Sequence, residues 1–311
     1  MFTPKMSAQV VALSGGVGGA KLASGLADLL EPGRLSVVVN TGDDFIHWGL
    51  HIAPDIDTVM YTLAKLAHPT QGWGLEGETF QALEAVGRYG GEAWFRLGDR
   101  DLATHLMRTQ ALSKGKTLTQ VTASLCSALG LKTRILPMSD GPRRTVFDTV
   151  DLGTLSFQEY FVKHAFRPVV RAIRFEGEPK PSAEVLAAVE AADFIVICPS
   201  NPYVSIDPII TLPGMREALS QKKVIAVSPI VGGKAIKGSA AKLSVELGRG
   251  EASAAGIARH YGALLSALVV EEGDEVDLEG LYVRATRTVM LNESDRRALA
   301  ADVLSVASSL L

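Results

Sequence analysis

The stretch VVALSGGVGGAKLASGLADLL, residues 10–30, decides the fold class. Its apolar residues 10–13 give way to a glycine run, and leucines at helical spacing follow, so the pattern predicts strand, glycine loop and helix. A second β-branched run, residues 35–39, ends in an Asp-Asp turn. The opening unit is therefore expected to be βαβ, with a parallel sheet. The glycines of the loop are Gly15, Gly16, Gly18 and Gly19.

The sheet is expected to be built from both ends of the chain. Residues from 55 to about 130 follow a helical pattern, with Thr117 and Gln120 placed like a capping box. The last segment, residues 293–311, predicts a closing helix. Strand-like runs return at 134–136, 169–175, 194–198 and 224–227. We therefore expect one α/β domain over residues 1–311: a Rossmann-like, mostly parallel sheet flanked by helices, with a helical lobe inserted at about 55–130.

Composition limits the partners. The 311 residues carry a formal net charge of -3, which gives no whole-chain attraction for nucleic acid. No apolar run approaches the ~20 residues that span a bilayer, and the first residues lack a signal-peptide pattern. With only Cys126 and Cys198, a disulfide framework has no support. We expect a cytoplasmic protein that binds small molecules and neither nucleic acid nor membrane, with a homodimer as the base-rate expectation.

The glycine run has the chemistry of a phosphate cradle. Where side chains are absent, backbone N–H groups and the N-terminus of a helix can approach a phosphate closely. The run departs from the P-loop, because Ala20 and Leu22 stand where that motif has its second glycine and its Ser or Thr. It departs from the dinucleotide fingerprint as well, because Lys21 stands where a small residue is needed. A tight turn that only packs helix against strand remains an alternative.

Four aspartates follow the second strand. Asp43 and Asp44 lie in the turn, and Asp55 and Asp57 open the next helix, so all are expected near the mouth of one sheet. Any one of them could instead cap a helix or form a turn. A diphosphate substrate needs a divalent cation, and carboxylate oxygens suit Mg²⁺. We predict Mg²⁺ as the cofactor, with Asp43, Asp44 and Asp57 as its candidate ligands.

Two histidines lie between these pairs of aspartates. His47 and His51 are four residues apart and could share one face of a helix. Neither a cysteine nor a zinc-protease frame accompanies them, so they are expected to line or support a pocket rather than to bind zinc.

Several stretches resemble, in order and spacing, those of the 2-phospho-L-lactate transferase (CofD-like) family. They are SGGVGGAKL (14–22), VVVNTGDDF (37–45), GLHIAPDIDTVMYTLA (49–64), RLGDRDLATHLMRTQ (96–110), ILPMSD (135–140), ICPSNPYVSI (197–206) and VSPIVGGKAIKG (227–238). The similarity covers nearly the whole chain. It departs at Gly238-Ser239, where many relatives have Gly-Pro.

The resemblance implies a transferase of coenzyme F-420 biosynthesis. Such an enzyme moves a phosphorylated three-carbon acid from a guanosine diphosphate carrier to the ribityl hydroxyl of the deazaflavin Fo and releases GMP. The family's contacts with Fo fall on Asp57 and Arg96, and Asp57 is also the candidate catalytic residue, because it could orient or deprotonate the attacking hydroxyl. The family's nucleotide-facing loops fall on Gly15, Gly16, Gly18, Gly19, Ser200, Asn201, Ser228 and Pro229.

Three aromatic side chains have two interpretations. Trp73, Trp94 and Tyr61 could stack on the deazaflavin, or they could belong to the core of the helical lobe. The acid that the donor carries also stays open, because phospholactyl, phosphoenolpyruvyl and phosphoglyceryl groups differ by only a few atoms.

Two alternatives come from other classes of protein. A non-catalytic nucleotide-sugar-binding regulator would share the glycine loop and the Asp-Asp turn, but its turn is followed by a glycine- and serine-rich loop, whereas residues 45–49 here are FIHWG. A nicotinamide-dependent oxidoreductase is a weaker alternative, because the dinucleotide fingerprint is absent and fold analogy alone does not supply a function.

Overall fold

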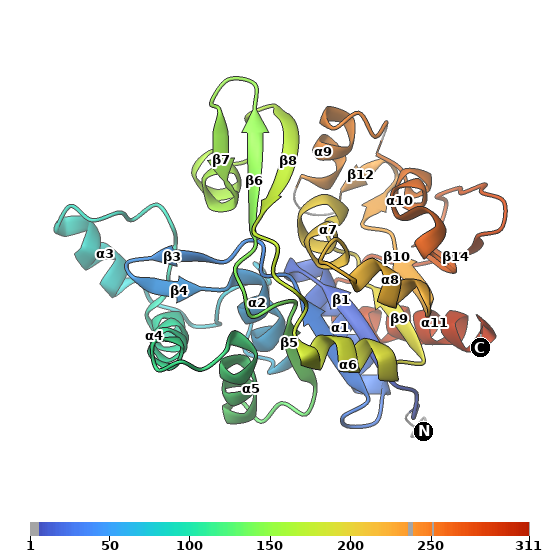
Figure 1. Cartoon of the computed structure of the whole chain (residues 1–311), viewed down its shortest axis with the longest axis horizontal. Helices are drawn as coiled ribbons and strands as arrows, with labels where there is room; N and C mark the ends of the chain where they lie inside the picture. Colours follow the sequence, from blue (N-terminus) through green and yellow to red (C-terminus); the bar gives the residue numbers. More distant parts are fainter. Residues whose placement is uncertain (1–5, 236–238, 251, 311) are drawn as a thin grey trace.

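The computed structural model describes residues 6–235, 239–250 and 252–310, so the departure at Gly238 lies outside the described residues. A seven-stranded sheet forms the centre of the molecule, in the order β14-β13-β10-β9-β1-β2-β5 (Figure 1). All its strand pairs are parallel, which confirms the predicted α/β class. The strands are β1 (Val10–Ser14), β2 (Leu35–Val39), β5 (Arg134–Pro137), β9 (Phe194–Ile197), β10 (Lys223–Val227), β13 (Ala267–Glu271) and β14 (Tyr282–Thr286).

Helices cover both faces of this sheet. Since successive side chains of a strand point to opposite faces, Val10 and Ala12 enter one core while Val11 and Leu13 enter the other. The first core is closed by α1 (Gly16–Leu29), α2 (Pro54–Leu63), α5 (Leu118–Ala128) and α11 (Glu293–Leu310). The second is closed by α6 (Ala183–Ala191), α7 (Asp207–Ile210), α8 (Met215–Ser220) and α10 (Ala254–Tyr261). Burial on both faces explains why inner strands such as β1 and β9 are continuous apolar runs.

The predicted helical segment is present. It consists of α2, α3 (Gln81–Arg88), α4 (Asp99–Ser113) and α5, and α3 and α4 lie to one side of the sheet (Figure 1). The capping box of Thr117 and Gln120 forms as predicted at the start of α5. The helix α2 packs into the core through Ile56 and Val59, whereas α3 has no buried residue. The segment therefore begins in the core and extends away from it.

One predicted strand belongs to a different sheet. Residues 169–175 were expected in the central sheet, but β8 (Val170–Glu176) pairs antiparallel with β6 (Arg144–Thr149), which also pairs with β7 (Thr154–Ser156). The reason is that only Val170 of β8 is buried, whereas the inner strands β1, β2 and β9 of the central sheet are buried throughout. The remaining elements are α9 (Ala240–Glu246), η1 (Glu159–Lys163), η2 (Pro202–Ile206), η3 (Gly262–Leu264), β11 (Ile230–Val231) and β12 (Lys234–Ala235).

The histidines lie on a hairpin, not on a helix. The strands β3 (Phe45–His47) and β4 (Leu50–Ile52) pair antiparallel, with His51 opposite Ile46. The turn between them has positive φ angles of 50° at Trp48 and 74° at Gly49, so the chain reverses instead of continuing as a helix. The expectation that His47 and His51 share a helical face was therefore wrong, and alternation along the strands puts the two side chains on opposite faces of the hairpin.

Two expectations from composition can be compared with the fold. Cys126 and Cys198 are both buried and free, as expected for a chain without a disulfide framework. Among the described residues, no helix combines the length and the apolar character needed to cross a bilayer.

Candidate active site

The glycine loop joins β1 to α1 and is packed tightly against its neighbours. A Cβ atom on Gly15 would lie 2.6 Å from Asp55 Oδ2, and one on Gly19 would lie 2.3 Å from Ser14 Oγ. At Gly18 the carbonyl oxygen of Pro199 would be 2.4 Å away, while Gly16 has a positive φ of 63°. The packing alternative is thus part of the explanation for these glycines. The loop also leaves the N-terminus of α1 at the carboxyl edge of the sheet, where a phosphate cradle is expected.

We predict that Gly19→Ala destabilises the protein by about 1–3 kcal/mol, because the added methyl group has no room beside Ser14. Gly87→Ala is a matched control: it lies inside α3, and its Cβ would make an ordinary 3.7 Å contact with Ala93. That change should be neutral or stabilising by up to about 1 kcal/mol. Urea unfolding of both variants measures the difference, and equal midpoints for Gly19→Ala and the parent chain would contradict the close packing.

The loops after β9 and β10 lie beside the glycine loop because β10, β9 and β1 are neighbours. The hydroxyl of Ser200 accepts from Gly15 N at 3.1 Å and donates to Gly15 O at 2.7 Å, so it fixes the glycine loop. Asn201 Oδ1 accepts from Tyr203 N at 3.1 Å. Ser228, which precedes the buried Pro229, accepts from the backbone N–H of Ile230 at 3.1 Å. These side chains shape the loops in which they lie.

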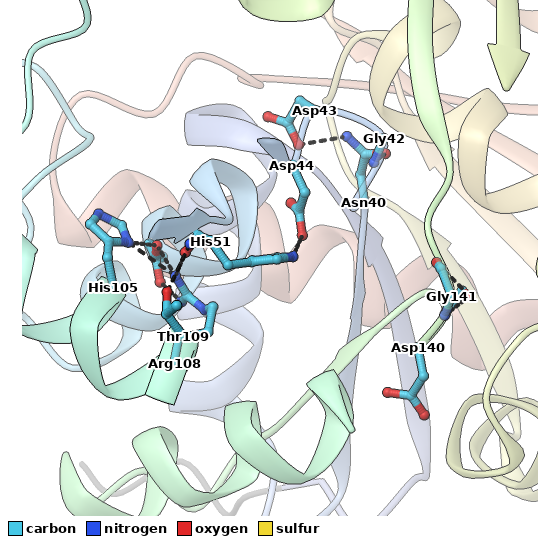
Figure 2. Close-up of polar contacts among 12 residues, drawn as sticks. Asn40, Gly42, Asp43, Asp44, His51, His105, Arg108, Thr109, Asp140 and Gly141 are labelled. Atoms are coloured by element: carbon cyan, nitrogen blue, oxygen red, sulfur yellow. Dashed lines mark hydrogen bonds and ion pairs between the residues drawn. The ribbon is translucent and has the colours of Figure 1, made fainter. Parts of the chain in front are cut away.

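The four aspartates follow the end of β2 or lie in the first turn of α2. Figure 2 shows Asp43 and Asp44 beside Asn40. Asn40 links Asp55 to Asp43, because its Nδ2 donates to Asp55 Oδ2 at 2.9 Å and to Asp43 Oδ1 at 3.4 Å. Asp44 points away from this pair toward His51, whose Nε2 lies 3.9 Å from its carboxylate. Among the described residues, neither carboxylate oxygen of Asp44 has a hydrogen-bond partner. Asp43, Asp44 and Asp55 thus form a buried, partly unsatisfied group of acids.

Burial and mutual repulsion perturb this group. Burial, followed by the charges of Asp55 and Asp44, raises the pKa of Asp43 well above its usual value. Burial also raises the pKa of Asp44, although the positive charge of Arg108 opposes it. For Asp55, burial raises the pKa to about 6 against the hydrogen bond from Asn40. Three acids that resist ionisation in one place form a site where a cation would be stabilising.

Asp57 differs from these acids because it has a cationic partner. Arg108 Nη1 donates to Asp57 Oδ2 at 3.0 Å, and Nη2 of the same guanidinium donates to the other carboxylate oxygen. His105 Nδ1 lies 3.6 Å from Asp57 Oδ2, and its Nε2 lies 3.4 Å from Asp101 Oδ2. One atom each from Asp57, Asp101 and His105 lies within 4.8 Å of the others, a spacing that a metal could use, but Arg108 already neutralises the charge there.

A cavity of about 360 Å³ opens against Asp43 and Asp57. Its wall is largely aromatic, and Tyr61 contributes to it as well. The aromatic rings from outside α2 are Trp73, Trp94, Phe95, Phe157 and Phe161. Arg96 lies in the wall too, with its guanidinium 4.4 Å from the centre of the Phe80 ring.

The three aromatic candidates, Tyr61, Trp73 and Trp94, therefore line the same cavity but have different roles there. Tyr61 is 2% exposed and its hydroxyl donates to Asp101 Oδ1 at 2.6 Å, so it belongs to the core as well as to the wall. Trp73 is 44% exposed, which leaves its ring free for a planar ligand. Trp94 stacks near Phe45 of the hairpin, at 6.5 Å between ring centres.

Arg108 and His105 are the site residues that sequence reasoning missed. Both lie on α4, where His105 is 1% exposed and Arg108 is fully buried. A signal was present, because Asp101, His105 and Arg108 are spaced by four and three residues and so form a polar stripe on one face of a helix. A polar stripe that faces inward toward Asp57 marks a functional or structural network rather than a solvated face.

Known proteins with similar sequences can be compared with this geometry. The family described as "2-phospho-L-lactate transferase CofD" matches residues 10–309. A phosphoenolpyruvate transferase of Streptomyces griseus is 41% identical over 316 residues, which cover 97% of this chain and 99% of that protein. A 2-phospho-L-lactate transferase of Methanosarcina acetivorans is 41% identical over 304 residues, which cover 96% of this chain and 98% of that protein.

A solved structure supports the fold alone. A member of the UPF0052 family from Bacillus halodurans superposes with a TM-score of 0.64 and covers 96% of this chain and 99% of its own. Its sequence identity of 16% is too low to carry an activity from that protein to this one.

Proposed function

Because the chain belongs to the 2-phospho-L-lactate transferase CofD family and is a transferase, we propose that it transfers a phosphorylated three-carbon acid from a guanosine diphosphate carrier to the ribityl hydroxyl of the deazaflavin Fo. The second product of this reaction is GMP. Relatives of equal identity are named for two different acids, phosphoenolpyruvate and 2-phospho-L-lactate, so the proposal covers the class of phosphorylated three-carbon acids.

The observation that carries the proposal is the cavity that is lined by aromatic rings and also by Asp43 and Asp57. Aromatic rings suit the flat face of a deazaflavin, and the polar end suits a sugar-alcohol chain that must donate a hydrogen bond. The neighbouring glycine loop supplies backbone N–H groups for a diphosphate. An acceptor in the cavity and a donor on the loop would then meet at the aspartates.

The proposed reaction is a direct displacement at phosphorus. The ribityl oxygen forms a bond to the distal phosphorus of the donor, the bond from that phosphorus to the GMP oxygen breaks, and the hydroxyl proton leaves. Such reactions depend mainly on in-line positioning and on charge neutralisation around the phosphoryl oxygens. Asp57 lies in the cavity wall and is our candidate to orient or deprotonate the hydroxyl, while Arg96 would contact Fo.

Mg²⁺ is the cofactor that we propose, and the residues present fit it. Within the described residues, neither carboxylate oxygen of Asp44 has a hydrogen-bond partner, and Asp43 is buried beside it, whereas Arg108 engages both oxygens of Asp57. Asp43 and Asp44 are therefore better candidate ligands than Asp57. A bound Mg²⁺ would offset the negative charge of the diphosphate.

We expect GDP to bind the protein with measurable heat, whereas UDP-N-acetylglucosamine and NAD should show none. The phosphate loop is common to many nucleotide-binding proteins, but the base pocket is not, so the base separates the transferase from the regulator. Isothermal titration calorimetry in the presence of Mg²⁺ measures all three ligands.

One result would replace this proposal with the regulator. Tight binding of UDP-N-acetylglucosamine together with no heat of binding for GDP would mean that the glycine loop binds a nucleotide sugar. The aromatic cavity would then need another ligand.

A further inference from the structure

A buried arginine is fixed on a carboxylate that lines the cavity. Arg108 comes from α4, is fully buried, and donates through Nη1 and Nη2 to the two oxygens of Asp57. Nη1 also lies 3.1 Å from His105 Nδ1 and 3.4 Å from the carbonyl oxygen of His51. Asp57 and His105 line the cavity and Arg108 does not, so Arg108 influences a bound ligand through these neighbours, and Asp57 is the one that it holds with two hydrogen bonds.

The surroundings of Asp57 explain why such a partner is needed. Asp43, Asp44 and Asp55 are all buried nearby, and the charge of Asp57 adds to the repulsion that Asp43 and Asp44 experience. Without the guanidinium, the carboxylate of Asp57 would be buried among like charges and would have to turn away or lose its charge. The planar fork of arginine also fixes the plane of the carboxylate, which a lysine ammonium does not.

Stability alone is a weak reason for this ion pair. A buried pair commonly stabilises a protein no more than well-packed apolar side chains of similar volume would. The helix α4 has other attachments to the core, since Thr109 Oγ1 accepts from His51 N at 2.8 Å and Tyr61 donates to Asp101. The bidentate geometry of the Asp57–Arg108 pair therefore needs an explanation other than stability.

We propose that Arg108 is a positioning residue for the acceptor substrate, which acts by holding the Asp57 carboxylate in the plane that meets the attacking hydroxyl. The inference rests on the proposed function, because it assigns the cavity to the acceptor. It adds a residue on α4 to the determinants of acceptor binding and leaves the donor side unaffected.

The first test separates the two substrates. Arg108→Lys keeps the positive charge but loses the planar fork of the guanidinium. Through a higher KM, a lower kcat or both, kcat/KM for the deazaflavin alcohol should therefore fall by a factor of about 10 to 10². The KM of the donor should change less than about twofold. Arg174→Lys is the matched control: Arg174 also contacts both oxygens of an aspartate, Asp148, but at the surface, and its variant should behave like the parent chain.

The second test asks whether Arg108 works through Asp57. We would measure kcat/KM for the acceptor in Asp57→Asn, in Arg108→Gln and in the double variant. The double variant should be no slower than Asp57→Asn, because nothing is left for Arg108 to position. It also removes both buried charges, so it provides the comparison with Asp57→Asn even where Arg108→Gln alone fails to fold.

Three results would overturn the inference. They are an equal rise in KM for donor and acceptor, a further loss caused by Arg108→Gln in the Asp57→Asn background, and an Arg108→Lys variant with a lowered melting temperature but unchanged kinetic constants. Failure of the proposed function would look different, since the parent chain itself would then transfer nothing to the deazaflavin alcohol.

Discussion

Asp57→Asn should lower the rate of transfer at least ~10²-fold, which is the lower end of a general-base contribution. Asparagine keeps the size of the side chain and still accepts a hydrogen bond, but it loses the negative charge that Arg108 holds in the wall of the cavity. The affinity for GDP should change little, because we assign Asp57 to the acceptor side of the proposed reaction. Steady-state rates and calorimetry with GDP measure the two effects separately.

The role of Asp57 has a matched control at Asp148 and two results that would contradict it. Asp148→Asn removes an aspartate with the same bidentate arginine contact at the surface, and it should leave the rate unchanged and have little effect on stability. Normal turnover of Asp57→Asn would reduce Asp57 to a residue of the first turn of α2. Loss of GDP affinity with intact binding of Fo would move Asp57 to the donor side.

Removing divalent cations should abolish turnover, and added Mg²⁺ should restore it. The reason is the group of Asp43, Asp44 and Asp55, which would face the proposed diphosphate donor, and in which the carboxylate oxygens of Asp44 have no hydrogen-bond partner in the described part of the chain. Offsetting the phosphate charge is worth several kcal/mol, or at least ~10² in rate. Rates in excess chelator, with Mg²⁺-saturated chelator as the control, test this. Full activity in free chelator would mean that no divalent cation takes part and that the aspartates only form turns and cap helices.

The same cation should stabilise the fold in a pH-dependent way. The folded-state pKa of Asp55 is raised to about 6, and those of Asp43 and Asp44 are raised as well, so the folded protein binds more protons than the unfolded chain. These acids therefore destabilise the protein above that pKa and stop doing so as the pH falls through it. Mg²⁺ should raise the melting temperature more at pH 7.5 than at pH 5.5. Equal shifts at both pH values would mean that the cation binds elsewhere.

The sequence was sufficient for the central fold where local pattern and burial agree. Residues 10–30 carry strand, loop and helix signals in succession, and β1 and α1 follow them closely. The hairpin of β3 and β4 was missed because the spacing of His47 and His51 also fits a helix, and only the positive φ angles at Trp48 and Gly49 reverse the chain. Local pattern cannot separate a short hairpin from a short helix.

Part of the site was also predictable from local sequence patterns. The aspartates end a strand and open a helix, so their meeting follows from a parallel sheet, whose carboxyl ends share one edge. For Arg108 the spacing from Asp101 and His105 predicts a shared helix face, but it does not predict that this face is buried, because an arginine within a helix is usually solvated. Its burial against Asp57 depends on how α4 packs beside the hairpin and α2, which is a tertiary property.

The most direct test of the proposed function is a product mass. The protein would be incubated with Fo, Mg²⁺ and guanosine diphosphate-linked donors of phospholactate, phosphoenolpyruvate and phosphoglycerate, each in a separate reaction. We predict that at least one donor yields GMP and a product with the mass of Fo joined to the phosphorylated acid through a phosphodiester. Unchanged Fo with all three donors, from a folded protein that binds UDP-N-acetylglucosamine, would contradict the proposal.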